Sequence, residues 1–394
     1  MLVSPFTLLL VLYFFTNFIS LVFGIYDGGM LLEGTFFELG AESLVWAFLL
    51  QQLFVLLLWS LYRLHIRRCS RAPLVLGGNY GLFLLAVQLF FMAYNQISGI
   101  NVAGVESHGS GALNYLFVLV PPDVLFVLIG VGLRSSRWFW LNCLVFLASM
   151  FLRGWMGGIF VVVVLILCRS YPIHISMRSF FRGMVGLGFV ALLLPVVIEA
   201  KWAMRTGVSV SAFMEGLAAL SLEGYGEAVR YVMNRLQHVG HVALIMEHAS
   251  MLHDFYVSGA FIPYWADGLP QMTVYKVLGY DYLRVNTFLV NEIFGYPDAY
   301  WNTNPGLAGW AALLQERAVM LFIYVVVLLT FVYAVLGRYG GSRYVLLIGC
   351  FSLVYLYHGW VGAFFNLCLY GVFLMVFARL RLLPRYRVRA GSAQ

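Results

Sequence analysis

Long apolar runs constrain this chain more than any other feature of its sequence. Stretches of about 18 or more residues with few charges recur from Leu2 to Phe377, and each could cross a hydrocarbon core of roughly 30 Å as a helix. Only 10% of the 394 residues are charged, against roughly 25% in soluble domains. The runs are too long and too uniformly apolar for barrel strands. We therefore expect an all-α, polytopic helical membrane protein.

The charges predict how the chain threads the membrane. Basic residues cluster in five short segments that contain no Asp or Glu: Arg63–Arg71, Arg134–Arg137, Arg169–Arg182, Arg338–Arg343 and Arg379–Arg389. By the positive-inside rule these segments face the cytoplasm, so the net charge of +7 mostly reflects topology. Nucleic acid is not needed to explain it. The first apolar stretch lacks a basic n-region and a cleavage site, and is expected to be retained as a helix.

This assignment predicts about ten transmembrane helices with both termini in the cytoplasm. The predicted spans cover about 2–24, 42–62, 74–95, 112–133, 138–152, 154–169, 181–200, 310–337, 344–358 and 360–378. Acidic residues then fall almost entirely outside, among them Asp27, Glu33, Glu38 and Glu42. We treat residues 1–394 as a single integral membrane domain.

One predicted external segment is far longer than a typical connection. It runs over about 110 residues, 201–310, and combines few charges with many aromatic side chains. Aromatic residues of this kind favour the membrane interface, so we expect the segment to fold against the bundle.

The stretch "SMFLRGWMGGIFVVVV" places Arg153 in an apolar run. Residues 138–168 are too few for two comfortable crossings and too many for one, so a turn at "RGWMGG" divides them into a tight hairpin. An arginine at this depth either faces a cavity, a partner or an anionic ligand, or snorkels to the interface. This stretch alone does not separate the two readings.

A second set of polar residues follows in "EGYGEAVRYVMNRLQHVGHVALIMEH". In a continuous helix one face would carry a polar stripe, with Arg235 at its edge, and the opposite face would be apolar. The stripe is Glu223, Glu227, Arg230, Asn234, His238, His241 and His248. A solvated face with paired charges is the simpler interpretation for an isolated helix. We expect the loop to lie over a cavity whose rim carries Arg153, Lys201 and Arg205, and this setting favours a functional interpretation of the stripe.

Guanidinium groups gathered on the external side are what a diphosphate ligand requires. Arginine offers planar, bidentate donors to phosphate and stays charged when partly desolvated. The same donors would stabilise a departing diphosphate. "HVGH" lacks the pattern of zinc enzymes, and we expect neither a metal nor another cofactor. Asp123 in "LVPPDVLF" is either part of a proton pathway or a satisfied carboxylate at a proline kink. The five cysteines imply no disulfide framework.

Three segments, over roughly residues 130–340, resemble the oligosaccharide repeat-unit polymerases, the Wzy-type O-antigen polymerase family. They are "FLRGWMGG", "NRLQHVGHVALIMEH" running into "HDFYVSGAFIPYW", and "NTNPGLAGW". The resemblance implies a GT-C-like glycosyltransferase architecture in the inner membrane of a bacterium, with its active site facing the periplasm. It also implies transfer of a glycan from undecaprenyl diphosphate onto the non-reducing end of another lipid-linked repeat unit.

By this resemblance Arg153, Arg230 and Arg235 would hold the donor diphosphate, with Lys201 and Arg205 in support. The acceptor hydroxyl would use His241, His248 or Glu247, in that order of preference. The remaining predicted substrate-binding residues are His238, Asn302 and Asn304. The expected partners are donor and acceptor undecaprenyl-diphosphate-linked oligosaccharides, membrane lipids, and the chain-length regulator and flippase of the same pathway.

Two alternatives stay open. An O-antigen ligase uses the same donor but transfers to lipid A core. A flippase for lipid-linked sugars would line a transport path with Arg153, although it gains little from a long external loop and should spread its charges through the spans.

Overall fold

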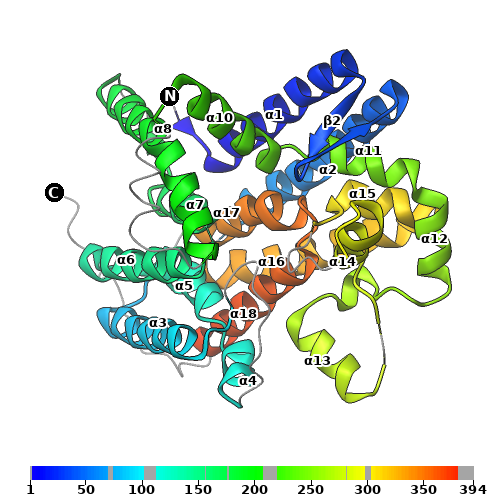
Figure 1. Ribbon diagram of the computed structural model, residues 1–394. Helices are drawn as coiled ribbons and strands as arrows, with labels where there is room; N and C mark the ends of the chain where they lie inside the picture. Colours follow the sequence, from blue (N-terminus) through cyan, green and yellow to red (C-terminus); the bar gives the residue numbers. More distant parts are fainter. Residues whose placement is uncertain are drawn as a thin grey trace.

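The computed structural model describes residues 2–69, 74–101, 112–155, 157–174, 177–206, 220–280, 282–297 and 303–379. Within these residues the chain is almost entirely helical (Figure 1). The described strands form two antiparallel pairs: β1 (Leu2–Val3) with β4 (Ile173–His174), and β2 (Gly29–Leu32) with β3 (Thr35–Glu38).

The helices of the first half are α1 (Pro5–Asp27), α2 (Ala41–Ile66), α3 (Gly78–Ser98), α4 (Ala112–Leu119), α5 (Pro122–Gly132), α6 (Ser136–Leu152), α7 (Gly157–Arg169) and α8 (Met177–Thr206). Those of the second half are α10 (Leu222–Leu236), α11 (Val239–Glu247), α12 (Ala249–Val257), α13 (Leu269–Val277), α14 (Val285–Phe288), α15 (Gly306–Leu314), α16 (Ala318–Tyr339), α17 (Ser342–Phe351) and α18 (Val361–Arg379). Short 3-10 or π turns occupy η1 (Tyr264–Ala266), η2 (Leu289–Ile293), η3 (Gln315–Arg317) and η4 (Ser352–Leu356).

Five helical segments of the described chain are long and apolar enough to cross a membrane. They are Pro5–Asp27, Ala41–Ile66, Gly78–Ser98, Gly306–Tyr339 and Val361–Ala378, and five shorter apolar helices accompany them. This is the architecture expected of a helical membrane protein. The count of ten crossings stays a prediction.

Helix α1 shows how these helices are oriented. Its polar residues Thr16, Asn17 and Ser20 are buried, whereas Phe15 and Phe23 are exposed. Water would favour the opposite arrangement, because exposing large apolar side chains costs hydrophobic free energy. In lipid the outward apolar face costs nothing, and the polar groups find partners inside the bundle.

The predicted span 112–133 is wrong as one continuous helix. The chain forms α4 and α5 instead, and the break falls between Leu119 and Pro122. Pro121 and Pro122 have no amide hydrogen to donate to the preceding turn, and Pro122 starts the next helix, where that donor is not required.

Segment 201–310 folds against the bundle where the structure describes it. Helix α11 packs on α1 and α2, and α15 packs on α2 and α11 (Figure 1). A side chain of α1 caps α11: Asn17 Oδ1 accepts hydrogen bonds from the backbone amides of His238 (2.8 Å) and Val239 (3.2 Å). This contact joins a spanning helix to the long connecting segment.

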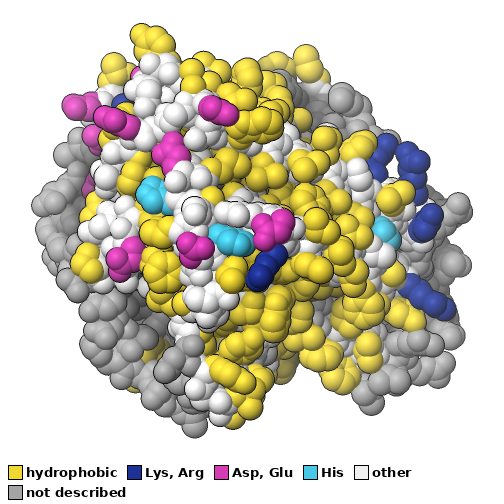
Figure 2. All heavy atoms as spheres, turned by 90° about the vertical axis from the view of Figure 1, so that its right-hand side faces the viewer, with side chains coloured by type: hydrophobic (Ala, Val, Ile, Leu, Met, Phe, Trp, Pro, Cys, Tyr) yellow, Lys and Arg dark blue, Asp and Glu magenta, His cyan; other side chains and the backbone are white. Residues whose placement is uncertain are grey.

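Charges are separated across the surface that bears α11 and α12. Figure 2 shows acidic side chains on one part of this face, a largely hydrophobic zone across the middle, and most of the visible basic side chains at the opposite edge. The arrangement agrees with the charge asymmetry read from the sequence.

Asn17→Ala should lower the free energy of unfolding by about 1–3 kcal/mol, because it leaves two buried amides without an acceptor. Thermal unfolding of the detergent-solubilised protein measures this loss. Gln88→Ala is the matched control, since Gln88 is also a buried amide but makes no side-chain hydrogen bond within the described chain. Equal effects of the two substitutions would rule out the capping role.

Candidate functional site

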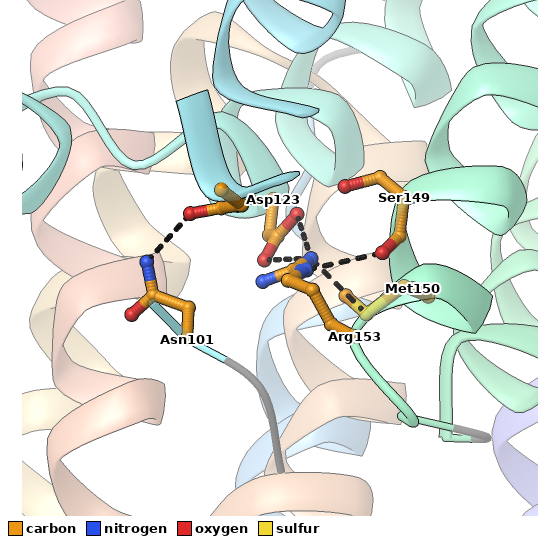
Figure 3. A network of polar contacts seen from close by, with 6 residues as sticks. Asn101, Asp123, Ser149, Met150 and Arg153 are labelled. Carbon is orange, nitrogen blue, oxygen red and sulfur yellow. Dashed lines mark hydrogen bonds and ion pairs between the residues drawn. The ribbon is translucent and has the colours of Figure 1, made fainter. Parts of the chain in front are cut away.

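Arg153 lies at the turn of the predicted hairpin, directly after α6. Its guanidinium Nη2 donates to both carboxylate oxygens of Asp123, at 3.1 and 2.9 Å, and its Nε donates to the Ser149 carbonyl at 3.2 Å (Figure 3). The Arg153 side chain is 4% exposed and that of Asp123 is 32% exposed. The Arg153 side chain is therefore buried, and its cation is neutralised by a carboxylate.

The position of Asp123 follows from its local sequence. It stands in the first turn of α5, after Pro122, where the helix dipole favours a negative charge. The rings of Phe91 and Trp155 lie 5.0 and 5.5 Å from the Arg153 guanidinium carbon and enclose it further. The sequence left Asp123 as part of a proton pathway or as a satisfied carboxylate. The structure shows a carboxylate with a partner.

The continuous helix expected over 223–248 is wrong. It divides at Gln237, where the backbone is extended, so α10 ends at Leu236 and α11 starts at Val239. The physical cause is the cap from Asn17, which takes the amides that a continuous helix would use internally. Helix α10 is largely exposed, whereas α11 is buried on almost all sides.

The division brings Arg235 against Glu33. Arg235 Nη1 and Nη2 each contact one oxygen of Glu33 at 3.2 Å, with the Arg235 side chain 49% exposed and that of Glu33 17% exposed. Glu33 stands with Gly34 in the two-residue turn between β2 and β3, where both have positive φ. His241 Nε2 lies 3.9 Å from Glu33 Oε1, too far for a hydrogen bond.

Beneath this pair lies a buried cluster of histidine rings. The His238 ring centroid is 5.2 Å from that of His241 and 5.0 Å from that of His358, and Tyr13 meets His358 edge-on at 5.0 Å. His238 Nδ1 and both ring nitrogens of His241 have no hydrogen-bond partner in the described part of the chain.

Burial lowers the pKa of both His238 and His241 from 6.5 to about 3. The proximity of His241 adds to the lowering for His238, and Arg235 and His358 add to it for His241. Both rings are therefore neutral at physiological pH. A neutral ring can donate one hydrogen bond and accept another.

The other predicted residues are dispersed. Arg230 is exposed on α10. Glu247 Oε1 accepts from the Gly40 amide at 3.0 Å, and His248 Nδ1 lies 3.0 Å from the Leu244 carbonyl, so both contact backbone. Lys201 and Arg205 belong to α8, but their side chains lie outside the described part of the structure, as does the whole of Asn302. Asn304 lines a small pocket with Asp267, Asn286 and Trp310.

The structure thus joins Arg235, His241 and His238 and places Arg153 in a separate site among α3, α5 and α6. Sequence reasoning missed the companions of Arg235 and His238, chiefly Glu33, Asn17 and His358. An external acidic residue at position 33 was visible in the sequence, but no spacing rule pairs it with position 235. Among the described residues, no group of three or more His, Cys, Asp or Glu is placed to hold a metal ion.

Comparison of the chain with protein-family models, curated proteins and solved structures finds no match.

Replacing Asp123 by Leu should destabilise the protein more than replacing Arg153 by Met, because Arg153 is the more deeply buried partner. We expect a loss of about 3 kcal/mol at most for Asp123→Leu, since its carboxylate is partly solvated. The double variant should recover part of that loss, as measured by thermal unfolding in detergent. Strictly additive effects would show that the pair does not couple.

The histidine cluster should make the protein less stable in acid. As the pH falls below about 6.5, the unfolded chain binds protons that the folded chain takes up only near pH 3, so stability decreases through this window. The thermal midpoint between pH 8 and pH 4 measures the slope. His238→Gln and His241→Gln should flatten it, while Gln237→Ala, which removes a buried amide beside them, should not. An unchanged slope in both histidine variants would contradict this account.

Proposed function

We propose that this chain is a repeat-unit polymerase, a metal-independent glycosyltransferase. It transfers a glycan from undecaprenyl diphosphate onto the non-reducing end of another lipid-linked repeat unit and extends O-antigen or a related surface polysaccharide. The proposal places it in the bacterial inner membrane with its active site on the periplasmic side. The segregation of acidic and basic side chains in Figure 2 supports that orientation.

The observation that carries the proposal is the half-exposed Arg235 guanidinium held by Glu33. Its planar fork engages a carboxylate through two parallel contacts, and the same geometry fits phosphate oxygens. A diphosphate bears more charge than one carboxylate, so it can displace Glu33 from Arg235. In the unliganded protein, Glu33 keeps the guanidinium in place.

The neighbouring cations support the same assignment. Helix α10, which carries Arg230 and Arg235, packs against α8, which carries Lys201 and Arg205, and the Tyr225 hydroxyl donates to the Leu192 carbonyl at 2.7 Å. Four cationic residues therefore belong to two helices that lie together. We propose that these residues attract an anionic headgroup, with Arg235 stabilising the charge on the departing diphosphate.

Arg153 has a different position in this proposal. Its charge is balanced by Asp123, so direct binding of diphosphate by Arg153 stays a prediction that needs this ion pair to open. We assign the primary contact with diphosphate to Arg235. Neutral His241, next to Glu33, is placed to hydrogen-bond the bound headgroup or an acceptor hydroxyl once Glu33 is displaced.

Arg235→Ala should reduce the release of undecaprenyl diphosphate by about 10²–10³-fold, as expected when one charge-stabilising donor is removed. The assay supplies the purified protein in liposomes with lipid-linked repeat units and follows released diphosphate lipid and glycan length. Arg235→Lys should retain part of the activity, because the charge remains but the fork is lost. Arg338→Ala, an exposed arginine in the last turn of α16, is the matched control.

Wild-type rates in Arg235→Ala would refute the role of this residue. If the wild-type protein releases no diphosphate lipid with a repeat-unit acceptor but does so with lipid A core, it is the alternative ligase.

The Arg153–Asp123 pair favours a second candidate, the flippase, because buried charges within apolar helices often line substrate or proton pathways. A flippase would move fluorescently tagged lipid-linked units across liposomes without releasing diphosphate lipid. That result would replace the polymerase proposal.

A further inference from the structure

A small pocket adjoins the histidine cluster and is lined by several side chains that can form hydrogen bonds. Four of its lining residues are polar or can hydrogen-bond: Asp267, Asn286, Asn304 and Trp310. They come from the loop after η1, from α14, from the segment before α15 and from α15 itself. The available space, about 10 Å³ for the centre of a water-sized group, holds a single hydroxyl.

The pocket and the histidines share a boundary of two glycines. Gly359 lines the pocket and contacts Gly306 so closely that a Cβ on Gly359 would lie 2.4 Å from the Gly306 amide nitrogen. A Cβ on Gly306 would in turn lie 3.3 Å from His238 Nδ1. Both glycines have positive φ, so the backbone as well as the space calls for glycine here. The pocket is therefore separated from His238 only by the backbone of these two glycines.

Asp267 is held in a one-sided way. Arg284 Nε and Nη2 both contact the same oxygen, Oδ1, at 3.1 and 3.0 Å. The other oxygen, Oδ2, has no hydrogen-bond partner among the residues that the structure describes. The Asp267 side chain is only 13% exposed, and this burial raises the pKa of its carboxyl group, while Arg284 opposes the rise. A carboxylate with one oxygen fixed and the other available can accept a proton.

Two buried atoms of the pocket residues also lack partners. Asn286 Oδ1 is an acceptor and Trp310 Nε1 is a donor, and neither has a hydrogen-bond partner in the described chain. A hydroxyl group both donates and accepts, so it fits a donor, an acceptor and a carboxylate better than an ion does. Buried polar atoms left unpaired cost about 1–3 kcal/mol each, which binding of a hydroxyl would recover.

An aromatic cluster includes Trp265, which is close to Asp267 in the chain. Trp265, two residues before Asp267, is 48% exposed, and its ring centroid lies 6.3 Å from that of Tyr275. Tyr280 and Tyr282 approach Tyr275 at 5.6 and 6.2 Å. Amphipathic rings of this kind are common in sites for small organic ligands, including those with apolar faces and hydroxyl edges.

We infer that this pocket receives the acceptor hydroxyl of the incoming sugar and that Asp267 is the base that takes its proton. The inference rests on the function proposed above. The acceptor oxygen forms a bond to the anomeric carbon of the donor glycan, and its proton passes to Asp267 Oδ2. The bond between the anomeric carbon and the diphosphate oxygen breaks, and its electron pair leaves with the diphosphate. Asp267 then returns the proton to solvent.

Asp267→Asn tests the inference with purified protein in liposomes and lipid-linked repeat units. We expect kcat to fall about 10²–10⁴-fold, the range for loss of a positioned base, with the KM for the donor unchanged. Glu292→Gln, which removes an exposed carboxylate of η2, is the matched control and should keep wild-type kcat.

The pH profile separates a base from a structural carboxylate. In the wild type, kcat should rise with pH as Asp267 loses its proton. Arg284→Gln should move this limb to higher pH, because it removes the cation that opposes the raised pKa. A merely structural role would not shift the limb.

The outcomes distinguish a failure of the proposed function from a failure of the inference about Asp267. If the wild type releases no undecaprenyl diphosphate, the proposed function fails and the inference fails with it. If the wild type is active and Asp267→Asn keeps more than a third of its kcat, or if Arg284→Gln leaves the pH limb in place, the inference alone is wrong. The pocket then holds a structural water.

Discussion

A charge or a backbone amide that enters apolar surroundings needs a partner, and much of this structure follows from that constraint. Arg153 is tolerated inside an apolar hairpin because Asp123, in the first turn of α5, neutralises it. Arg169 donates to the carbonyls of Gly130 and Leu133 at the end of the same helix. Asn17 provides the acceptor for the first amides of α11. Each contact joins two helices, and the last joins helices that are far apart in the sequence.

The same constraint leaves two arginines in different situations, because one is buried with its partner and the other can reach a ligand. Arg153 is buried, and Asp123 balances its charge. Arg235 is half exposed and held by one carboxylate at the edge of a turn. Only the second arrangement can exchange its partner for an anionic ligand without a change in helix packing. The chemistry proposed for this protein therefore centres on α10, β2 and α11.

The histidine cluster at the start of α11 is polar and neutral. His238, His241 and His358 lie ring against ring, and Gly306 and Gly359 allow the adjoining turns to approach them. Beyond the glycines lies the pocket of Asp267. Arg284 keeps the carboxylate from standing unpaired next to Trp310.

Much of the fold was predictable because lipid imposes simple rules on length and charge. The predicted spans agree with α1, α2, α3, α6, α7, α16 and α18 to within several residues, and the turn at Arg153 is where residue counting placed it. The failures have local causes. Consecutive prolines divide 112–133, and a cap from a distant helix divides 223–248, which hydrophobic periodicity alone does not reveal.

By itself, the sequence determined that the chain is a helical membrane protein with a charge asymmetry. Composition, helix length and the distribution of arginines settle these properties without reference to contacts. Only the tertiary structure decided which cations are satisfied and which can bind a ligand. The partners of Arg153 and Arg235 lie 30 and 202 residues away in the chain, and no local pattern encodes pairings at that range.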